Sequence, residues 1–372
     1  MRTSDTKFYT AAEAAQIDLS VGEGESTILF VGDVMTWSDQ MKRRISEGQP
    51  DYPFVATSSM VRSADFSVAN LEGPVAVEAA IGRRWRFPYK MDPRVVGGIK
   101  RAGFDLVSTA NNHLIDCGKP GIVETLEHLR RAGLPQFGAG RDLAEAARPY
   151  VAVVAGVKVA FLAYTSPETW IPDGAAARVE GSFRRRQKRM RKRMMATPSR
   201  PGTVVVDAEI VDRAVRSADK IADLVVVYPH WGIRYEQPVY EFQTEVAHAA
   251  IDAGADLVVG HHIHTWQPIE RYKDRMIIYG LGNFAFDSRN RRAREGLVAR
   301  VILADARFDR VELHPLFTRN VDTKVDFQAK LFKGESAKRV LERLAEASRP
   351  LGAVVHIRGD RGLVYALPVA GE

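Results

Sequence analysis

The sequence has almost no cysteine, with Cys117 as the single thiol in 372 residues. One thiol cannot form an intrachain disulfide, so the fold does not require an oxidising compartment. No stretch approaches the roughly 18–20 apolar residues that a membrane-spanning helix needs. Residues 1–20 lack the apolar core of a secretory signal and contain acidic side chains. These absences predict a cytoplasmic protein without a transmembrane segment.

Most of the chain also lacks an excess of positive charge, although the net charge is +7. Residues 184–193 (RRRQKRMRKR) contain eight Lys or Arg, and without those eight charges the net charge would be −1. Such a run attracts polyanions such as polyglutamate, anionic lipid or nucleic acid, unless it is simply a solvated loop. Charge on all sides of a helix argues against a membrane-surface helix. No aromatic residues or known nucleic-acid motif accompany the run, so we rank nucleic acid below a polyanionic substrate such as polyglutamate.

The pattern that recurs along the chain is an amphipathic helix, a turn carrying Asp, an apolar strand and a polar cluster. Apolar, β-branched runs such as LVVVY indicate strands buried on both faces and covered by helices. The alternation of helix and strand predicts an α/β sheet with right-handed crossovers. The pattern occurs at 60–73, 99–113, 217–232 and 249–264, after a first strand within 26–35.

The rest of the chain has simpler patterns. Residues 166–202, rich in proline, glycine and basic residues, are expected to form a loop or helical insertion between core strands. Turn residues at Ala155-Gly156, Lys273-Asp274 and Gly359-Asp360 lie between runs with strand patterns. Hairpins are therefore expected at 151–165, 266–286, 297–317 and 354–367, and an amphipathic helix at 336–347.

Polar side chains follow each of the five core strands. In open α/β sheets the ligand site lies at the carboxyl ends of the strands, so these side chains should converge on one rim. The side chains are Asp33, Asn70 and Glu72, Asn111 to His113, His230, and His261 to His264.

The residue types at these strand ends indicate a metal site. Asp33 ends a very apolar strand, where a buried carboxylate is costly without a cation or several donors, although it could instead cap a helix. His262 and His264, two residues apart on an extended strand end, would point to the same side. Mixed oxygen and nitrogen ligands without a thiolate suit Mn, Fe or Zn. We therefore predict one or two divalent ions held by Asp33, Glu72, Asn112, His230, His262 and His264.

Neighbouring residues are candidates for catalysis and substrate binding. His113, beside Asn112, is free to donate a proton, and Asp116 could orient His113 or cap the following turn. Arg234 near a metal would favour an anionic phosphate or carboxylate substrate. Further substrate contacts are expected from Tyr235, Gln243 and Asn283.

Several motifs together are specific to a known family: GDVM (32–35), ANLEGPV (69–75), STANNHLIDCG (108–118), HWG (230–232), and the segment from GADLVVGHHIHTWQPIE to YGLGNFAFD (254–287). In this order they resemble the CapA, or capsule-synthesis PGA_cap, family over about residues 26–320. That family resembles the calcineurin-like metallophosphoesterases. The resemblance implies an α/β calcineurin-like metallophosphatase sandwich of two central β-sheets flanked by helices, with a dinuclear metal centre. It also implies an association with poly-γ-glutamate synthesis, usually through a membrane-anchored form.

The resemblance assigns roles to particular residues. Glu72 resembles the metal-bridging acid, and His113 resembles the general acid that protonates the leaving oxygen. The remaining ligands divide between the metals, with Asn112, His230 and His262 on one and Asp33 and His264 on the other.

The sequence departs from the patterns of these two families in three ways. Met35 stands where the phosphoesterases have the histidine of a D-x-H motif, so one metal should be a ligand short and bind more weakly. Glu72 replaces the usual aspartate. The CapA family often has an acidic residue after HWG, whereas this chain has Ile233 and Arg234.

We divide the chain into an N-terminal extension (1–25), a CapA-like metallophosphatase domain (26–325) containing the basic insertion (166–202), and a C-terminal helix and hairpin (326–372) packed on that domain. The leading hypothesis is a metal-dependent hydrolase acting on a phosphorylated or carboxylate-rich peptide-like substrate. One alternative is a metal-assisted peptide or amino-acid epimerase whose acid and base come from Asp33, His113 or His264. The other is a non-catalytic accessory protein for poly-γ-glutamate assembly.

Overall fold

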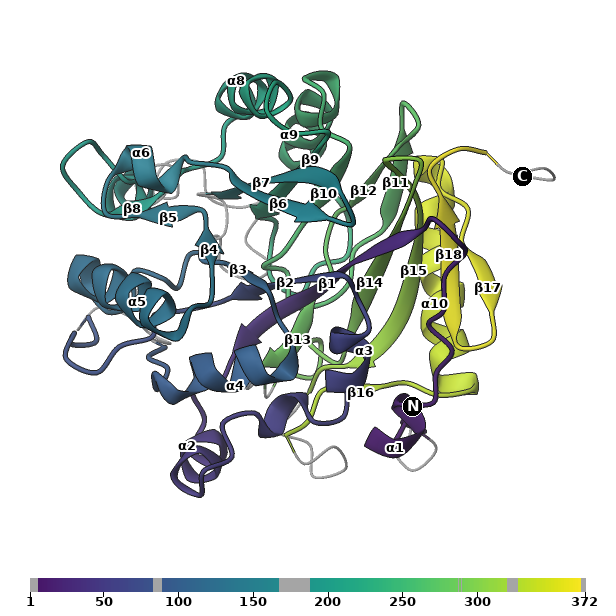
Figure 1. The fold of residues 1–372 in the computed structure, drawn as a ribbon, viewed down its shortest axis with the longest axis horizontal. Coiled ribbons are helices and arrows are strands. Elements are labelled where there is room, and N and C mark those ends of the chain that lie inside the picture. The colour runs from purple at the N-terminus through teal and green to yellow at the C-terminus, as the bar shows by residue number, and fades with distance from the viewer. Residues whose placement is uncertain are drawn as a thin grey trace.

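A computed structural model describes residues 6–82, 89–166, 188–286, 288, 290–319 and 327–368. Within these residues two large β-sheets pack face to face, with helices on their outer faces (Figure 1). The expected α/β sandwich of two central sheets flanked by helices is confirmed. The helix–strand repeats divide between the two sheets, because the strands of the later two repeats lie in the second sheet.

The larger sheet has the order β17-β18-β15-β14-β1-β2-β3-β4, with β13 also paired to β1 and β16 to β15. Neighbouring strands from β1 to β4 are parallel, whereas β1 is antiparallel to its other neighbour, β14. The strands are β1 (Ser26–Met35), β2 (Phe66–Leu71), β3 (Leu106–Ser108), β4 (Gln136–Phe137), β13 (Asn283–Phe286), β14 (Glu295–Ala304), β15 (Arg307–Phe317), β16 (Lys330–Leu331), β17 (His356–Arg358) and β18 (Arg361–Tyr365).

The smaller sheet has the order β11-β12-β10-β9-β7-β6, in which β7, β9, β10 and β12 are parallel and the two edge strands are antiparallel. Its strands are β6 (Tyr150–Val154), β7 (Val157–Thr165), β9 (Leu224–His230), β10 (Leu257–Val259), β11 (Ile269–Tyr272) and β12 (Arg275–Ile278), and a separate short pair consists of β5 (Ala139–Gly140) and β8 (Gly202–Thr203).

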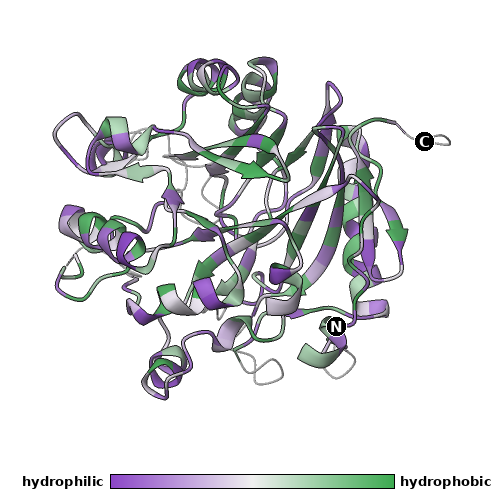
Figure 2. Cartoon of the chain, in the orientation of Figure 1, coloured by the Kyte–Doolittle hydropathy of each residue, from purple (hydrophilic) through white to green (hydrophobic). Residues whose placement is uncertain are grey.

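Side chains alternate between two layers along the central strands. In β1, Phe30 packs into the core between the sheets, whereas Leu29 packs under the helices on the outer face. In β9, Tyr228 packs between the sheets and Val227 packs against α8 and α9. Burial on both faces explains the continuous apolar runs of the sequence, and Figure 2 shows the corresponding apolar interior.

Helices cover the outer faces of both sheets. On the larger sheet, α5 ends at Gly133, whose φ of 63° is the left-handed conformation that commonly terminates a helix. On the smaller sheet, α8 begins after Asp207, whose carboxylate accepts from the Glu209 N–H. The helices are α1 (Ala11–Ala14), α2 (Asp39–Ser46), α3 (Ser58–Arg62), α4 (Arg94–Ala102), α5 (Gly118–Ala132), α6 (Leu143–Ala146), α8 (Ala208–Ala218), α9 (Glu241–Asp252) and α10 (Glu335–Ser348), with 3₁₀ turns at Tyr52–Phe54 and Arg349–Leu351.

The C-terminal helix and three of the four predicted hairpins are confirmed. The hairpin expected at 266–286 is confined to β11 and β12, because Asn283–Phe286 forms β13 of the larger sheet. Ala155 and Gly156 between β6 and β7 have φ values of 48° and 90°, and Lys273 and Asp274 between β11 and β12 have 49° and 58°. Positive φ at both central residues matches the twist of antiparallel strands, as in type I′ turns. The β14–β15 and β17–β18 hairpins and α10 also lie where they were expected.

Part of the basic run lies in a helix. Residues 184–187 fall outside the described residues, but 188–194 are helical, and Met190 and Met194 are buried against Leu114 and α5. The expectation of charge on all sides is therefore wrong, because two methionines one turn apart attach this helix to the fold. The basic side chains of the described part of the run, Lys188, Arg189, Arg191, Lys192 and Arg193, are partly or fully exposed.

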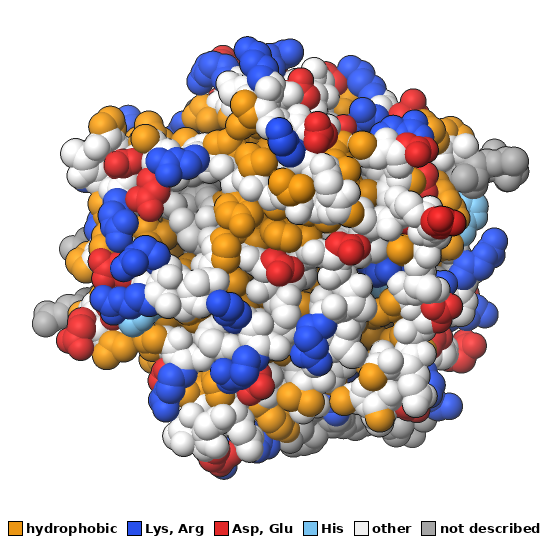
Figure 3. All heavy atoms as spheres, viewed as in Figure 1, with side chains coloured by type: hydrophobic (Ala, Val, Ile, Leu, Met, Phe, Trp, Pro, Cys, Tyr) orange, Lys and Arg blue, Asp and Glu red, His pale blue; other side chains and the backbone are white. Residues whose placement is uncertain are grey.

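The described surface is mixed in charge, and none of its helices is both long and apolar enough to cross a bilayer. Figure 3 shows basic and acidic side chains interspersed on one face, with hydrophobic side chains gathered near its middle, where β6 and β7 lie in Figure 1. Val153 of the edge strand β6 is 67% exposed.

A buried ion pair joins the N-terminal segment to the larger sheet. Arg300 of β14 lies opposite Glu312 of β15, and its Nη1 donates to the Glu312 carboxylate at 2.9 Å. The same guanidinium donates to the backbone oxygen of Leu19. Both charged side chains are almost fully buried, so each depends on the other for compensation. The division of the chain into three segments stays a prediction.

We predict that Arg300→Met lowers the free energy of unfolding by about 3 kcal/mol, because it leaves the buried Glu312 carboxylate without its closest cation. Urea denaturation measures the change. Arg216→Met, which removes the cation of an exposed pair with Asp212, is the matched control and should cause a much smaller loss. Equal losses in the two variants would show that the buried pair is not structurally important.

Candidate metal centre

The polar side chains predicted to converge do meet at one place. Asp33 lies near the end of β1, Glu72 follows β2, and His230 ends β9. His262 and His264 lie in the bends that follow β10. The ends of parallel strands from both sheets therefore supply one buried cluster, and every one of these five residues is at most 2% exposed.

The geometry divides the cluster into two groups that share one carboxylate. Glu72, His230 and His262 each offer a ligand atom within 4.8 Å of the others, and so do Asp33, Glu72 and His264. Nε2 of His230 and Nε2 of His264 both lie 3.9 Å from the same Glu72 oxygen, Oε1. We call these groups the His230 triad and the Asp33 triad. Their shared member is Glu72, the residue that resembles a bridging acid.

Asn112 adds a fourth donor to the His230 triad. Its side-chain oxygen lies 2.7 Å from Nε2 of His230, and His262 Nδ1 lies 3.1 Å from that same nitrogen. The His230 triad with Asn112 therefore offers four donor groups, whereas the Asp33 triad offers three. This difference fits the expectation that one of two ions binds more weakly.

The donor set fits a divalent cation. Both oxygens of Glu72, Oδ2 of Asp33 and Nε2 of His262 are buried without a hydrogen-bond partner. Buried carboxylate oxygens without donors are costly, and a cation at this position would compensate them. Carboxylate, imidazole and amide donors suit Mn, Zn or Fe rather than a metal that requires thiolates.

Glycines bring the ligand-bearing segments close to their neighbours. A Cβ on Gly32 would lie 1.8 Å from the backbone oxygen of Gly282, to which the next residue, Asp33, donates its N–H. A Cβ on Gly260 would lie 2.0 Å from the backbone oxygen of Tyr279. Only glycine permits these approaches without displacing the backbone. Gly32 and Gly260 therefore fix the backbone position of the residues that follow them, Asp33 and His261.

The expected geometry of the two neighbouring histidines is wrong. His262 and His264 were expected on an extended strand, but β10 ends at Val259 and the two residues have φ values of 94° and 60°. Positive φ is unfavourable for residues other than glycine and costs on the order of 1–3 kcal/mol each. The strained bends aim the two rings at different triads, which strand alternation would not do.

Buried amides connect the two triads. The Asn70 amide nitrogen donates to Oδ1 of Asp33 at 2.8 Å and lies 3.3 Å from Nδ1 of His230. Asn111 donates to the Asn70 side-chain oxygen and to the Leu71 backbone oxygen. The sequence placed both asparagines at strand ends, but it contained no signal that they would support the ligands from behind.

His113 faces the cluster and is held by Asp116. Nδ1 of His113 donates to Oδ2 of Asp116 at 2.7 Å, while Nε2 lies 3.9 Å from Oε1 of Glu72. The Tyr89 ring packs on His113 with centroids 4.1 Å apart, and the Tyr89 N–H donates to the same Asp116 oxygen. Asp116 therefore orients His113, one of the two alternatives considered from the sequence. Tyr89 was missed, because it follows no core strand.

The four expected substrate contacts have different surroundings. Arg234 and Tyr235 are half-buried beside the cluster, with the Tyr235 ring 5.5 Å from that of His264. Asn283 places its side-chain oxygen 2.8 Å from Nδ1 of His264, a contact that orients a ligand. Gln243 is fully buried and its amide donates to Gln267. These contacts indicate that Gln243 supports the packing rather than contacting a substrate.

The electrostatics of the cluster follow from its burial. Burial raises the pKa of Glu72 well above its usual range, and the charge of Asp33 raises it further, while Arg234 opposes the rise. Burial lowers the pKa values of His230 and His262 well below their usual range. Burial also opposes ionisation of Asp33, but contacts with His261 and His264 hold its pKa well below the usual value. A bound cation would favour the ionised form of Glu72.

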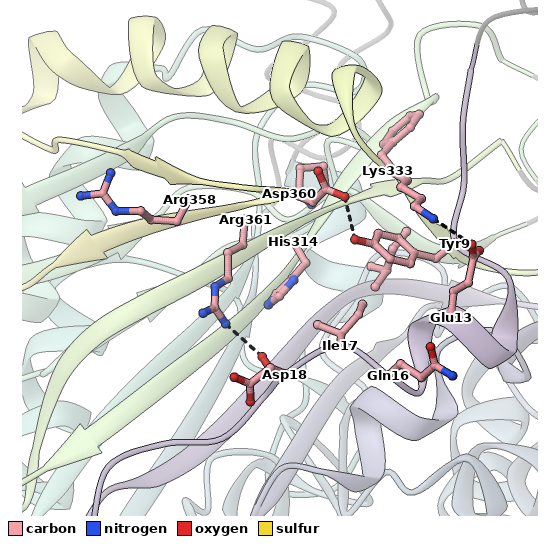
Figure 4. A pocket seen from close by; sticks show the side chains of 13 residues that line it. Tyr9, Glu13, Gln16, Ile17, Asp18, His314, Lys333, Arg358, Asp360 and Arg361 are labelled. Carbon is pink, nitrogen blue, oxygen red and sulfur yellow. Dashed lines mark hydrogen bonds and ion pairs between the residues drawn. The ribbon is translucent and has the colours of Figure 1, made fainter.

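A cavity of about 470 Å³ lies elsewhere, between the N-terminal segment and the C-terminal hairpin (Figure 4). Three contacts between the two segments involve its polar groups: Tyr9 donates to Asp360, Lys333 pairs with Glu13, and Arg361 donates to the backbone oxygen of Asp18. None of the described residues that line it is a candidate ligand. These contacts indicate a structural junction between the two segments.

Comparison with known proteins finds relatives whose names concern capsule, PGA or polyglutamine synthesis. "Capsule biosynthesis protein CapA" of Bacillus anthracis is 30% identical over 291 residues, which cover 75% of this chain and 64% of that protein. "PGA biosynthesis protein CapA" of Bacillus subtilis (strain 168) is 31% identical over 289 residues, covering 77% and 70%. A "probable polyglutamine synthesis accessory protein" of Mycobacterium tuberculosis is 28% identical over 233 residues, covering 60% and 56%. The chain thus spans less than two thirds of the Bacillus anthracis relative.

Solved structures that the chain matches include a hypothetical protein of Thermus thermophilus, with a TM-score of 0.47 and 14% identity, covering 78% of this chain and 99% of that one. A calcineurin-like phosphoesterase, YfkN of Bacillus subtilis, has a TM-score of 0.41 and 11% identity, covering 76% and 87%. Likenesses this distant do not transfer an activity.

The family model described as "Bacterial capsule synthesis protein PGA_cap" matches residues 27–288, which contain all of the candidate ligands. The match agrees with the order of motifs in the sequence and with the two curated CapA relatives. The chain therefore belongs to the bacterial capsule synthesis PGA_cap family.

Proposed function

We propose that this protein is a metal-dependent hydrolase that acts on a phosphorylated or carboxylate-rich peptide-like substrate. The observation that supports this proposal most strongly is the pair of triads that share the buried carboxylate of Glu72. Two adjacent sites with a common carboxylate are the arrangement that two-metal hydrolases use. The names of the Bacillus relatives concern capsule and PGA biosynthesis, which suggests a role in poly-γ-glutamate metabolism.

The residues that would hold the ions are those of the two triads. Glu72, Asn112, His230 and His262 would hold one ion, and Asp33, Glu72 and His264 the other. A bound pair of Mn, Zn or Fe ions supplies an activated water and a clamp for phosphoryl or carboxyl oxygens. The smaller number of donors in the Asp33 triad makes its ion the weaker one.

The chain's own residues supply proton transfer and substrate attraction. His113 donates a proton to the leaving oxygen, because its Nε2 faces the cluster while Asp116 holds its Nδ1. Arg234 attracts the anionic group of the substrate. Asn283 orients the ring of His264, because its side-chain oxygen lies 2.8 Å from Nδ1 of His264. Oδ2 of Asp33 lies 3.5 Å from the same nitrogen. A polyanion bound at 184–193 and the cytoplasmic location stay predictions.

A non-catalytic accessory role is the second candidate, and the name of the Mycobacterium tuberculosis relative favours it. In that role the metal centre binds a carboxylate-rich polymer without cleaving it. The two candidate functions differ in substrate turnover but not in metal binding, so metal content and turnover must both be measured.

We predict that the wild-type protein binds two Mn²⁺ ions with unequal affinity. Glu72→Gln should lose tight binding of both ions because both triads share Glu72, whereas His264→Ala should lose only the weaker one. Equilibrium dialysis followed by elemental analysis gives the stoichiometry. Retention of two ions by Glu72→Gln would contradict the shared-carboxylate arrangement.

We predict that His113→Ala lowers kcat for a phosphoester substrate by about 10²–10⁴-fold while the metal content stays unchanged, because the variant removes only the proton donor. Asp116→Asn should give a smaller loss, since the imidazole is still hydrogen-bonded but less well oriented. Single-turnover kinetics with Mn²⁺-loaded protein measure both effects.

The control for this experiment is His128→Ala, which removes a partly buried histidine of α5 paired with Glu124. It should retain full activity. Metal-loaded wild type that binds polyglutamate without cleaving it would support the accessory role. Incorporation of solvent deuterium without cleavage would indicate an epimerase.

A further inference from the structure

His261 is a buried histidine that belongs to neither triad. It follows Gly260 and pairs as an isolated β-bridge with His230, so its backbone joins the ends of β9 and β10. The side chain is 0% exposed, and its ring lies 4.1 Å from that of Tyr228, centroid to centroid. Neither ring nitrogen has a hydrogen-bond partner. A buried imidazole without a partner is costly, so this position needs an explanation beyond packing.

The polar group that His261 approaches is Asp33. Nδ1 of His261 lies 3.4 Å from Oδ1 of Asp33, and the Asn70 amide donates to the same oxygen at 2.8 Å. The other oxygen, Oδ2, has no donor and lies 3.5 Å from Nδ1 of His264. The two oxygens therefore have different surroundings, with Oδ1 held from behind and Oδ2 facing the Asp33 triad.

We propose that His261 is a positioning residue that, together with Asn70, holds Asp33 with Oδ2 turned toward the weaker metal site. The proposal rests on the metal centre of the proposed function, but it concerns ion affinity and does not depend on the reaction. Nδ1 of His261, 3.4 Å from Oδ1 of Asp33, is the group that would donate to this oxygen while Oδ2 holds an ion. Groups that orient a metal-binding carboxylate commonly contribute about 10–100-fold to metal affinity.

The departure at Met35 explains why this support matters here. Met35 is 2% exposed and stands in the sequence where the phosphoesterases have the histidine of a D-x-H motif, and a thioether is a weak donor for Mn²⁺ or Zn²⁺. The Asp33 triad therefore has only three ligand groups. With so few ligands, rotation of Asp33 away from the site would remove a large part of the coordination.

The alternative explanation is that His261 only packs against Tyr228, and two substitutions separate the roles. His261→Phe keeps an aromatic ring against Tyr228 but removes the donor. His261→Asn removes the ring but places an amide N–H near the position of Nδ1. His314→Phe is the matched control, because His314 is also buried, 3.9 Å from a carboxylate, but belongs to a distant strand.

The experiment is a Mn²⁺ titration of each variant, followed by isothermal calorimetry and by the EPR signal of bound Mn²⁺, with melting temperatures measured in EDTA. We expect His261→Phe to weaken the second ion about 10–100-fold and leave the first unchanged. His261→Asn should restore the second ion to within a few-fold of wild type. His314→Phe should bind both ions as wild type does.

Wild-type affinity for the second ion in His261→Phe would overturn the proposal, and so would an equal loss in His261→Phe and His261→Asn, which would indicate packing. A wild-type protein with only one ion would also overturn it. If the wild type binds two ions and hydrolyses nothing, the proposed hydrolase function fails while the role of His261 is still measured by these affinities.

Discussion

The buried carboxylate of Glu72 is the constraint around which the centre is organised, because both of its oxygens lie in the interior without a hydrogen-bond donor. An uncompensated carboxylate in such a position is expensive, and its elevated pKa expresses that cost in the absence of a cation. A divalent ion on each side removes the cost. The surrounding histidines, the two asparagines behind them and the strained bends after β10 all follow from the need to bring donors to this carboxylate.

The fold provides that convergence by using two sheets instead of one. Strands β1 and β2 of the larger sheet carry Asp33 and lead to Glu72, while β9 of the smaller sheet ends on His230. A single sheet would place these side chains along a row, whereas two packed sheets surround a common point. The positive φ values of His262 and His264 show that the backbone accepts strain to bring the last two ligands to the same point.

The sequence was sufficient to predict the five core strands, most of the hairpins and the set of converging residues, because these depend on local signals, whereas short strands such as β4 and β16 were not predicted. Turn residues such as Ala155-Gly156 set the hairpins, and apolar runs that end in polar residues marked the strand ends. The division into two sheets was not visible in the helix–strand alternation, because that pattern is the same whether neighbouring strands share a sheet or not. Only the family resemblance supplied it.

The orientation of individual side chains was also beyond the sequence. Regular strand geometry predicted that His262 and His264 would point to one side, but tertiary contacts bend the chain directly after β10. Asn70, Tyr89 and His261 act through contacts with residues distant in the chain, such as the 3.4 Å approach of His261 to Asp33. Contacts of this kind leave no periodic pattern, so they appear only when the packed structure is known.

The most direct test of the account is a crystal structure of the protein soaked with Mn²⁺, with anomalous differences measured at the manganese edge. We predict two anomalous peaks, one on each side of the Glu72 carboxylate and about 3.5–4 Å apart. The peak beside Asp33 and His264 should have the lower occupancy. A single peak, or none at full Mn²⁺ saturation, would contradict the shared-carboxylate centre.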